Sequence, residues 1–72
     1  MKLIVVVEKA PQSNWGAYAP DLDDSVIATG STREETIRRF REALRDLARY
    51  KQEEGEDFPQ ITELEIRETI AA

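Results

Sequence analysis

The sequence contains neither cysteine nor histidine. Without these residues the chain has no disulfide, no thiolate nucleophile, no Cys/His zinc site and no Ser-His or Cys-His relay. Its 72 residues form a single domain, 1–72, and a chain of this length buries only about 60% of the surface that its unfolded form exposes. Since small domains often depend on disulfides, metals or another chain, we expect a homodimer or a higher homo-oligomer.

Long apolar runs and excess positive charge are also absent. The opening segment, Met1 to Glu8, is too short and too soon charged for a signal peptide, and no run approaches the length of a transmembrane helix. We therefore expect a cytoplasmic protein. Lys and Arg number 10 against 15 Asp and Glu, which gives a net charge of −5. An acidic domain repels nucleic acid and anionic lipid, so we expect neither as a partner and a basic protein instead.

β-Branched residues between charged ends predict a first strand over Lys2 to Glu8, with apolar side chains on both faces. One face carries Leu3, Val5 and Val7, and the other carries Ile4 and Val6. We expect the domain's own helix to cover one face and a neighbouring subunit to cover the other, with a partly exposed apolar face as the alternative. Turn residues over Lys9 to Asn14 predict a hairpin loop to a second strand, Trp15 to Ala19, which Pro20 ends.

A third short strand is expected over Val26 to Thr29, with Gly30 as its breaker and a helix start directly after it. Two overlapping pairs have the capping-box spacing: Ser31 with Glu34, and Thr32 with Glu35. We favour Thr32 as the N-cap because both glutamates then lie in the first turn, where the helix dipole favours anions. The helix is predicted from Arg33 to Glu54, with Gly55 in the left-handed conformation beyond its end.

On a helical wheel, the apolar residues of this helix share one face, which predicts an amphipathic helix on a sheet. That face carries Ile37, Phe40, Leu44, Leu47 and Ala48, with Ala43 and Tyr50 at its edge. We also expect ion pairs at i,i+4 between Glu34 and Arg38 and between Glu35 and Arg39.

The segment from Ile61 to Ile70 alternates in polarity, which predicts a fourth strand. Thr62, Leu64, Ile66 and Ile70 share one face, and Glu63, Glu65 and Arg67 share the other. A short helix is the alternative, because Ile66 and Ile70 also have four-residue spacing. Phe58, in the preceding turn, is expected to fold back onto the helix end. The predicted fold class is α+β: a three-stranded antiparallel sheet, one long helix and a C-terminal strand, in the order β-β-β-α-β.

Asp21, Asp23 and Asp24 form the densest carboxylate cluster, in a turn with Leu22 as its apolar anchor. Three carboxylates in a turn suit Mg²⁺ or Ca²⁺, but the calcium-loop spacing and its glycine are missing, so we favour a solvated turn. The sequence shows no nucleophile–base pair, phosphate-cradling loop or cofactor motif. We therefore predict no enzyme activity, no catalytic residue, no metal and no cofactor.

Four arginines lie beside the apolar face of the helix: Arg38, Arg41, Arg45 and Arg49. We call them the arginine stripe and interpret it as a solvated face. Phosphate binding, or pairing with carboxylates such as Glu63 and Glu65 of the same or another chain, is the alternative.

Trp15 and Tyr18 point to opposite faces of their strand, so at most one of them lies on the helix side. The other is a candidate contact residue, since exposed large aromatics often anchor interfaces. The predicted partner-binding residues are Trp15, Tyr18, Asp21, Asp23 and Asp24.

The stretch from Gly16 to Leu22, G-A-Y-A-P-D-L, and the stretch from Ala28 to Glu35, A-T-G-S-T-R-E-E, resemble the HicB-like antitoxin family. The family pattern is an aromatic residue, alanine and Pro-Asp-Leu, then G-x-T-x-E-E-A and an amphipathic helix. The resemblance implies a β-β-β-α-β domain with a partly degraded ribonuclease H-like fold. It also implies a non-enzymatic antitoxin that forms oligomers and neutralises HicA, a small basic RNA-cleaving toxin.

This chain departs from the family pattern at two places. Asp23-Asp24-Ser25 replaces the Pro-Gly-Cys that follows Asp-Leu, and Thr36 stands where alanine is usual. Family members often carry a C-terminal DNA-binding domain, and we expect none here because the sequence stops at Ala72. The alternatives are a stand-alone oligomeric relative with a regulatory or scaffolding role, and a vestigial nuclease that uses the aspartate cluster with a metal.

Overall fold

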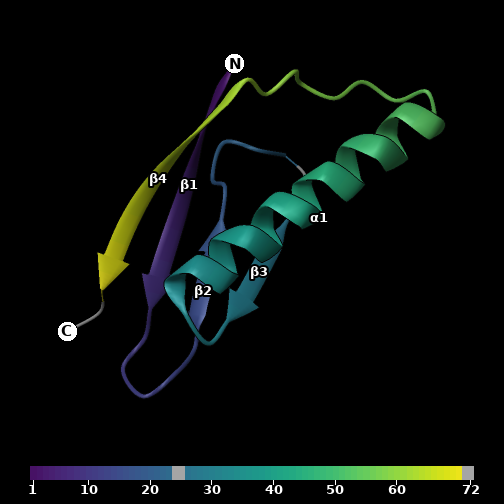
Figure 1. Ribbon diagram of the computed structural model, residues 1–72. Coiled ribbons are helices and arrows are strands. Elements are labelled where there is room, and N and C mark those ends of the chain that lie inside the picture. Colours follow the sequence, from purple (N-terminus) through teal and green to yellow (C-terminus); the bar gives the residue numbers. More distant parts are fainter. Residues whose placement is uncertain (24–25, 71–72) are drawn as a thin grey trace.

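The computed structural model describes residues 1–23 and 26–70, with only the backbone of Ile70 included. The elements are β1 (Lys2–Lys9), β2 (Trp15–Tyr18), β3 (Ile27–Gly30), α1 (Arg33–Glu53) and β4 (Glu63–Ile70). The strands form one mixed sheet in the order β3-β2-β1-β4, and α1 lies across one of its faces (Figure 1). The α+β class predicted from the sequence is confirmed.

β1 is central, because it pairs antiparallel with β2 and parallel with β4. Its side chains Leu3, Val5 and Val7 are fully buried on the face toward α1, which we call the inner face. Facing residues of a ladder share a side of the sheet, so Ala17 and Ala28 join Val7 there. These two small side chains allow α1 to approach closely, and the helix lies mainly over the β2–β3 half of the sheet (Figure 1).

The helix begins at the cap predicted from the sequence. The Thr32 hydroxyl accepts a hydrogen bond from the Glu35 N–H at 3.1 Å. The Glu35 carboxylate reaches one residue further back than a capping box requires and accepts from the Ser31 N–H at 3.1 Å. This backbone hydrogen bond, followed by the charge of Arg39, holds the pKa of Glu35 below its ordinary value of 4.5. Two independent contacts therefore fix the start of α1.

The start of α1 packs closely against the end of β3. Thr36 is fully buried, and its hydroxyl donates to the Thr32 carbonyl at 2.7 Å, so the buried polar group is satisfied. A Cβ on Gly30 would come within 2.7 Å of the Thr36 hydroxyl oxygen. Gly30 was predicted only as a strand breaker, but the structure shows that it is the last residue of β3 and leaves room for the helix.

The C-terminal segment is a strand, which decides between the two alternatives left open by the sequence. Along all eight of its residues β4 runs parallel to β1, and Leu64 and Ile66 pack against the core on the inner face.

The segment that connects α1 to β4 is held at its β4 end by hydrogen bonds to Met1. The Met1 ammonium donates to the Gln60 carbonyl at 2.7 Å, and the Thr62 N–H donates to the Met1 carbonyl at 3.0 Å.

Element boundaries differ from the predictions by one or two residues. β2 ends at Tyr18, β3 is shifted by one residue, and β4 starts at Glu63. The helix ends at Glu53 with Glu54 as its cap, and Gly55 has a φ of 69°, as expected for the residue that follows.

One of the two predicted ion pairs on the helix is wrong. Glu35 pairs with Arg39 as expected, at 3.5 Å. Arg38 pairs with Glu42 at 3.1 Å instead of Glu34. Both carboxylates lie one turn from Arg38, so the spacing alone did not distinguish them.

Replacing Gly30 with alanine should destabilise the domain by about 1–3 kcal/mol, because the new methyl group overlaps Thr36 and the neighbouring backbone. Gly16→Ala is the matched control, since a Cβ there meets only the Ala28 carbonyl oxygen, at 3.9 Å. Urea unfolding of both variants measures the difference. Equal stability of the two would contradict a close approach of helix and strand.

The depressed pKa of Glu35 predicts an acid-sensitive helix start. The charged carboxylate of Glu35 stabilises the folded state. This stabilisation is complete above pH 4.5 and is lost as the pH falls through the lower folded-state pKa. Glu35→Gln should therefore be less stable than the parent at neutral pH, and the two should converge on acidification. Thermal unfolding over a pH series tests this, with the exposed first-turn variant Glu34→Gln as control. If Glu35→Gln remained less stable than the parent by the same amount at acidic pH, the stabilising role of the Glu35 charge would be wrong.

Candidate functional site

The face of the sheet opposite α1, which we call the outer face, has no helix over it in the described part of the chain (Figure 1). The strand register places four apolar side chains there: Ile4, Val6, Tyr18 and Ile27. We call them the outer apolar strip. Ile4 and Val6 are half-buried, whereas Tyr18 is 37% exposed and Ile27 is 71% exposed. The chain's own helix therefore covers only the inner face, and the neighbouring subunit expected over the outer face stays a prediction.

Three members of the strip form one continuous row across three strands. Val6 faces Tyr18, and Tyr18 faces Ile27, each in an antiparallel ladder. Side chains that face each other in this way are close neighbours, with Cβ atoms about 4.5–5.5 Å apart. The row therefore presents one connected apolar surface with an aromatic ring at its centre.

A carboxylate stands at the tip of this aromatic ring. The Tyr18 hydroxyl donates a hydrogen bond to Glu8 at 3.2 Å. The negative charge of Glu8 is the main cause that raises the pKa of Tyr18 above its ordinary value of 10.0. The hydrogen bond favours one orientation of the ring, and Glu8 adds an acidic border to the apolar strip.

The predicted partner-binding residues do not share one surface. Tyr18 lies on the outer face, whereas Trp15 is half-buried and packs against the core. Asp21 and Asp23 are exposed in the turn after β2, and Leu22 packs against the core as their anchor. Asp24 lies outside the described residues. Among the residues that are described, no group of three or more His, Cys, Asp or Glu side chains is placed to hold a metal ion.

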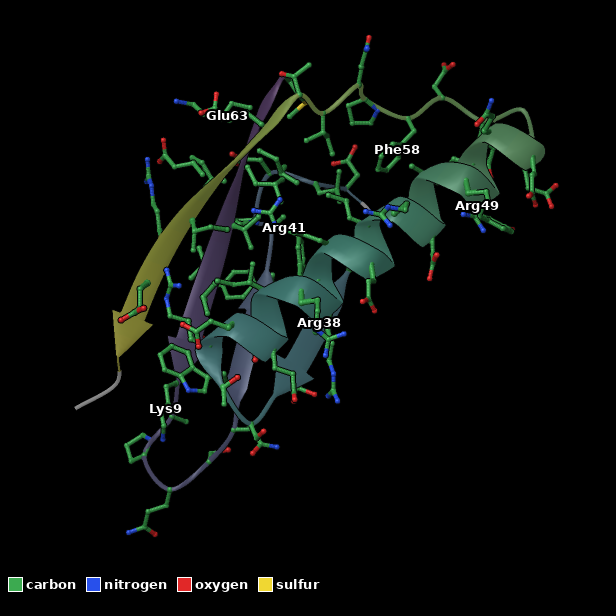
Figure 2. The ribbon with its side chains drawn as sticks, viewed as in Figure 1. Lys9, Arg38, Arg41, Arg49, Phe58 and Glu63 are labelled. Carbon is green, nitrogen blue, oxygen red and sulfur yellow. The ribbon has the colours of Figure 1, made fainter. Side chains whose placement is uncertain are left out.

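The arginine stripe borders a groove that the sequence did not reveal. Arg41 and Arg45 line an open space of about 420 Å³ between α1 and residues 58–64. Figure 2 shows Phe58 pointing from that segment toward the helix, which confirms the predicted folding back. Within residues 1–23 and 26–70, Arg41 and Arg45 make no ion pair, whereas Arg38 pairs with Glu42. The groove depends on the path of an irregular segment, and residue patterns carry no signal for such a path.

At the β4 edge of the outer face, the Glu65 carboxylate interacts with two cationic side chains. Glu65 accepts from Arg67 at 2.7 Å and pairs with Lys2 at 3.3 Å. The Arg67 hydrogen bond, followed by that of Lys2, lowers the pKa of Glu65. The β4 edge is therefore charged, in contrast to the apolar centre of this face.

In the part of the chain that the structure describes, no helix combines the length and apolar character needed to cross a membrane. Comparisons with protein-family models, with curated proteins and with solved structures found no match. The surfaces of the chain and its sequence motifs therefore carry the information about its function.

Removing the Glu8 charge should lower the pKa of Tyr18 toward 10.0. The measurement is a titration of phenolate absorbance in a Tyr50→Phe background, where Tyr18 is the single tyrosine. Asp21→Asn is the control, because its carboxylate makes no hydrogen bond to the Tyr18 hydroxyl. If Glu8→Gln and Asp21→Asn left the pKa of Tyr18 equally unchanged, the Glu8 contact would be wrong.

Proposed function

We propose that this chain is a HicB-like, antitoxin-type protein-binding domain without enzyme activity. In this proposal it binds and neutralises a small basic RNA-cleaving toxin of the HicA type. The observation that carries the proposal is the outer apolar strip, which is open, centred on Tyr18 and bordered by Glu8. The motifs at 16–22 and 28–35 support the same family. The degraded ribonuclease H-like fold is part of this proposal, and the element order is compatible with it.

The surface has the anatomy of a protein interface. Aromatic and aliphatic side chains at the centre supply affinity, and charged groups around them supply orientation and rate of encounter. Glu8, Asp21 and Asp23 are exposed carboxylates on β1 and the turn after β2, and the whole chain has a net charge of −5. Such a field attracts a basic protein. Neutralisation then requires only that the bound domain covers the toxin's RNA-binding surface.

A second candidate is a stand-alone oligomeric relative with a regulatory or scaffolding role. It is favoured by the amount of open sheet, since both the outer face and the β4 edge remain uncovered by the described residues. The reading frame beside this gene distinguishes the two candidates. A small basic protein encoded there favours the antitoxin, and its absence favours the stand-alone relative.

The antitoxin proposal predicts that this chain co-purifies with that basic neighbour and restores growth when both are expressed. Tyr18→Ala should raise the dissociation constant by about tenfold or more, because it removes the aromatic centre of the strip. Tyr50→Ala is the matched control, since Tyr50 is a 54% exposed tyrosine on α1, away from the outer face.

Two results would contradict the proposal. One is that the neighbour neither co-purifies nor is neutralised. The other is that Tyr18→Ala and Tyr50→Ala weaken the complex equally, which would place the contact elsewhere.

A further inference from the structure

β4 is the long open edge of the sheet. It pairs with β1 in an unbroken register of eight residues, and its other side has no partner in the described chain. Exposed edge strands are usually protected by being short, by a bulge or proline, or by a covering element. β4 contains no proline, its register has no bulge, and α1 does not lie over it.

The opposite edge shows how this fold protects a strand. β3 is only four residues long and lies under α1. Its Thr29 carbonyl accepts a hydrogen bond from the Arg39 guanidinium at 3.0 Å. The protection of one edge and the openness of the other indicate that β4 is available for pairing.

We propose that β4 pairs with β4 of a second copy of this chain, antiparallel, with Ile66 on the two-fold axis. The pairing joins the two four-stranded sheets into one continuous sheet. This dimer rests on neither candidate function, because it uses the β4 edge and leaves the outer apolar strip open.

The charges of β4 select this register. In an antiparallel pair of identical strands, one residue faces its own copy and its neighbours face each other in reverse order. With Ile66 on the axis, Glu65 faces Arg67 of the other copy, and this happens twice. With Glu65 or Arg67 on the axis instead, two like charges face each other, which is destabilising. The sequence Glu65-Ile66-Arg67 is thus complementary to itself in one register.

Association also gives Arg67 a second carboxylate partner. Within one chain Arg67 shares Glu65 with Lys2, and its side chain stays 62% exposed. Residues two apart on one strand are about 6.5–7 Å apart, whereas facing residues of an antiparallel pair have Cβ atoms about 4.5–5.5 Å apart. The other copy therefore places a second carboxylate opposite Arg67, in addition to Glu65 of its own chain, which Arg67 already reaches at 2.7 Å.

The inner face of β4 also accommodates a copy of itself. Ile66 faces Val5, which is fully buried, yet Ile66 is only half-buried because its other side is open. On the two-fold axis Ile66 meets its own copy. Leu64 faces Glu68 of the other copy, whose charge is already paired with Arg33 within its own chain. The pairing therefore buries apolar surface and adds no unpaired charge.

The test uses two charge reversals, Glu65→Arg and Arg67→Glu. Each variant alone places like charges opposite each other at both positions, so its dimer dissociation constant should rise by about tenfold. An equimolar mixture should restore dimerisation, because each chain of one variant then faces complementary charges on the other. Sedimentation measures the affinities, and native mass spectrometry identifies the mixed dimer by its mass.

Glu53→Arg and Arg49→Glu are the matched controls, with the same charge changes on exposed positions of α1. Alone and mixed, they should dimerise like the parent chain. A parent chain that stays monomeric at high micromolar concentration would overturn the proposal. So would a dimer that both β4 variants leave unchanged, or one that mixing fails to restore.

A second measurement covers the case in which a charge reversal unfolds the chain. Because the sequence has no cysteine, a single introduced thiol gives an unambiguous cross-link. Under added oxidant, Ile66→Cys should form a disulfide-linked dimer much faster than Thr29→Cys on the opposite edge. Equal rates for the two variants would overturn the proposal.

Discussion

In the described residues, one helix covers one face of a sheet whose central strand is apolar on both sides. Leu3, Val5 and Val7 are removed from water by α1, while Ile4 and Val6 on the same strand are not. Because the hydrophobic contribution scales with the apolar area removed from water, this half-covered strand sets how much stability a single chain can gain. The outer apolar strip and the partly buried β4 follow from the same shortage of covering surface.

Much of the local structure could be predicted from residue patterns. Alternation over 2–8 and 61–70 correctly grouped the side chains of β1 and β4 by face, although it did not show which face of β1 lies under the helix, and Thr32 was identified as the helix cap. These features depend on neighbours along the chain. The burial of Thr36 and the space over Gly30 were missed, because they arise where α1 meets β3, and no pattern along the chain places Thr36 against Gly30.

The candidate surfaces were only partly accessible from the sequence. Tyr18 was identified as a candidate contact residue, since alternation showed that it and Trp15 could not both lie under the helix. The row through Val6, Tyr18 and Ile27 required the strand register, which short strands do not specify by themselves. Likewise, the groove between α1 and residues 58–64 could be identified only once the path of that segment was known. The exposed positions of Asp21 and Asp23 agree with the solvated turn that the sequence favoured, and their role in partner binding stays a prediction.

The parallel pairing of β1 with β4 has a consequence for synthesis. Among the described elements, β1 emerges from the ribosome first and β4 emerges last. The chain can form the β1–β2–β3 hairpins early, but one edge of its central strand stays unpaired until β4 is released. Long-range pairing of this kind is slow and leaves strand edges exposed during folding. The nascent chain therefore passes through an interval in which its most apolar strand is open to any neighbouring chain on the same messenger RNA.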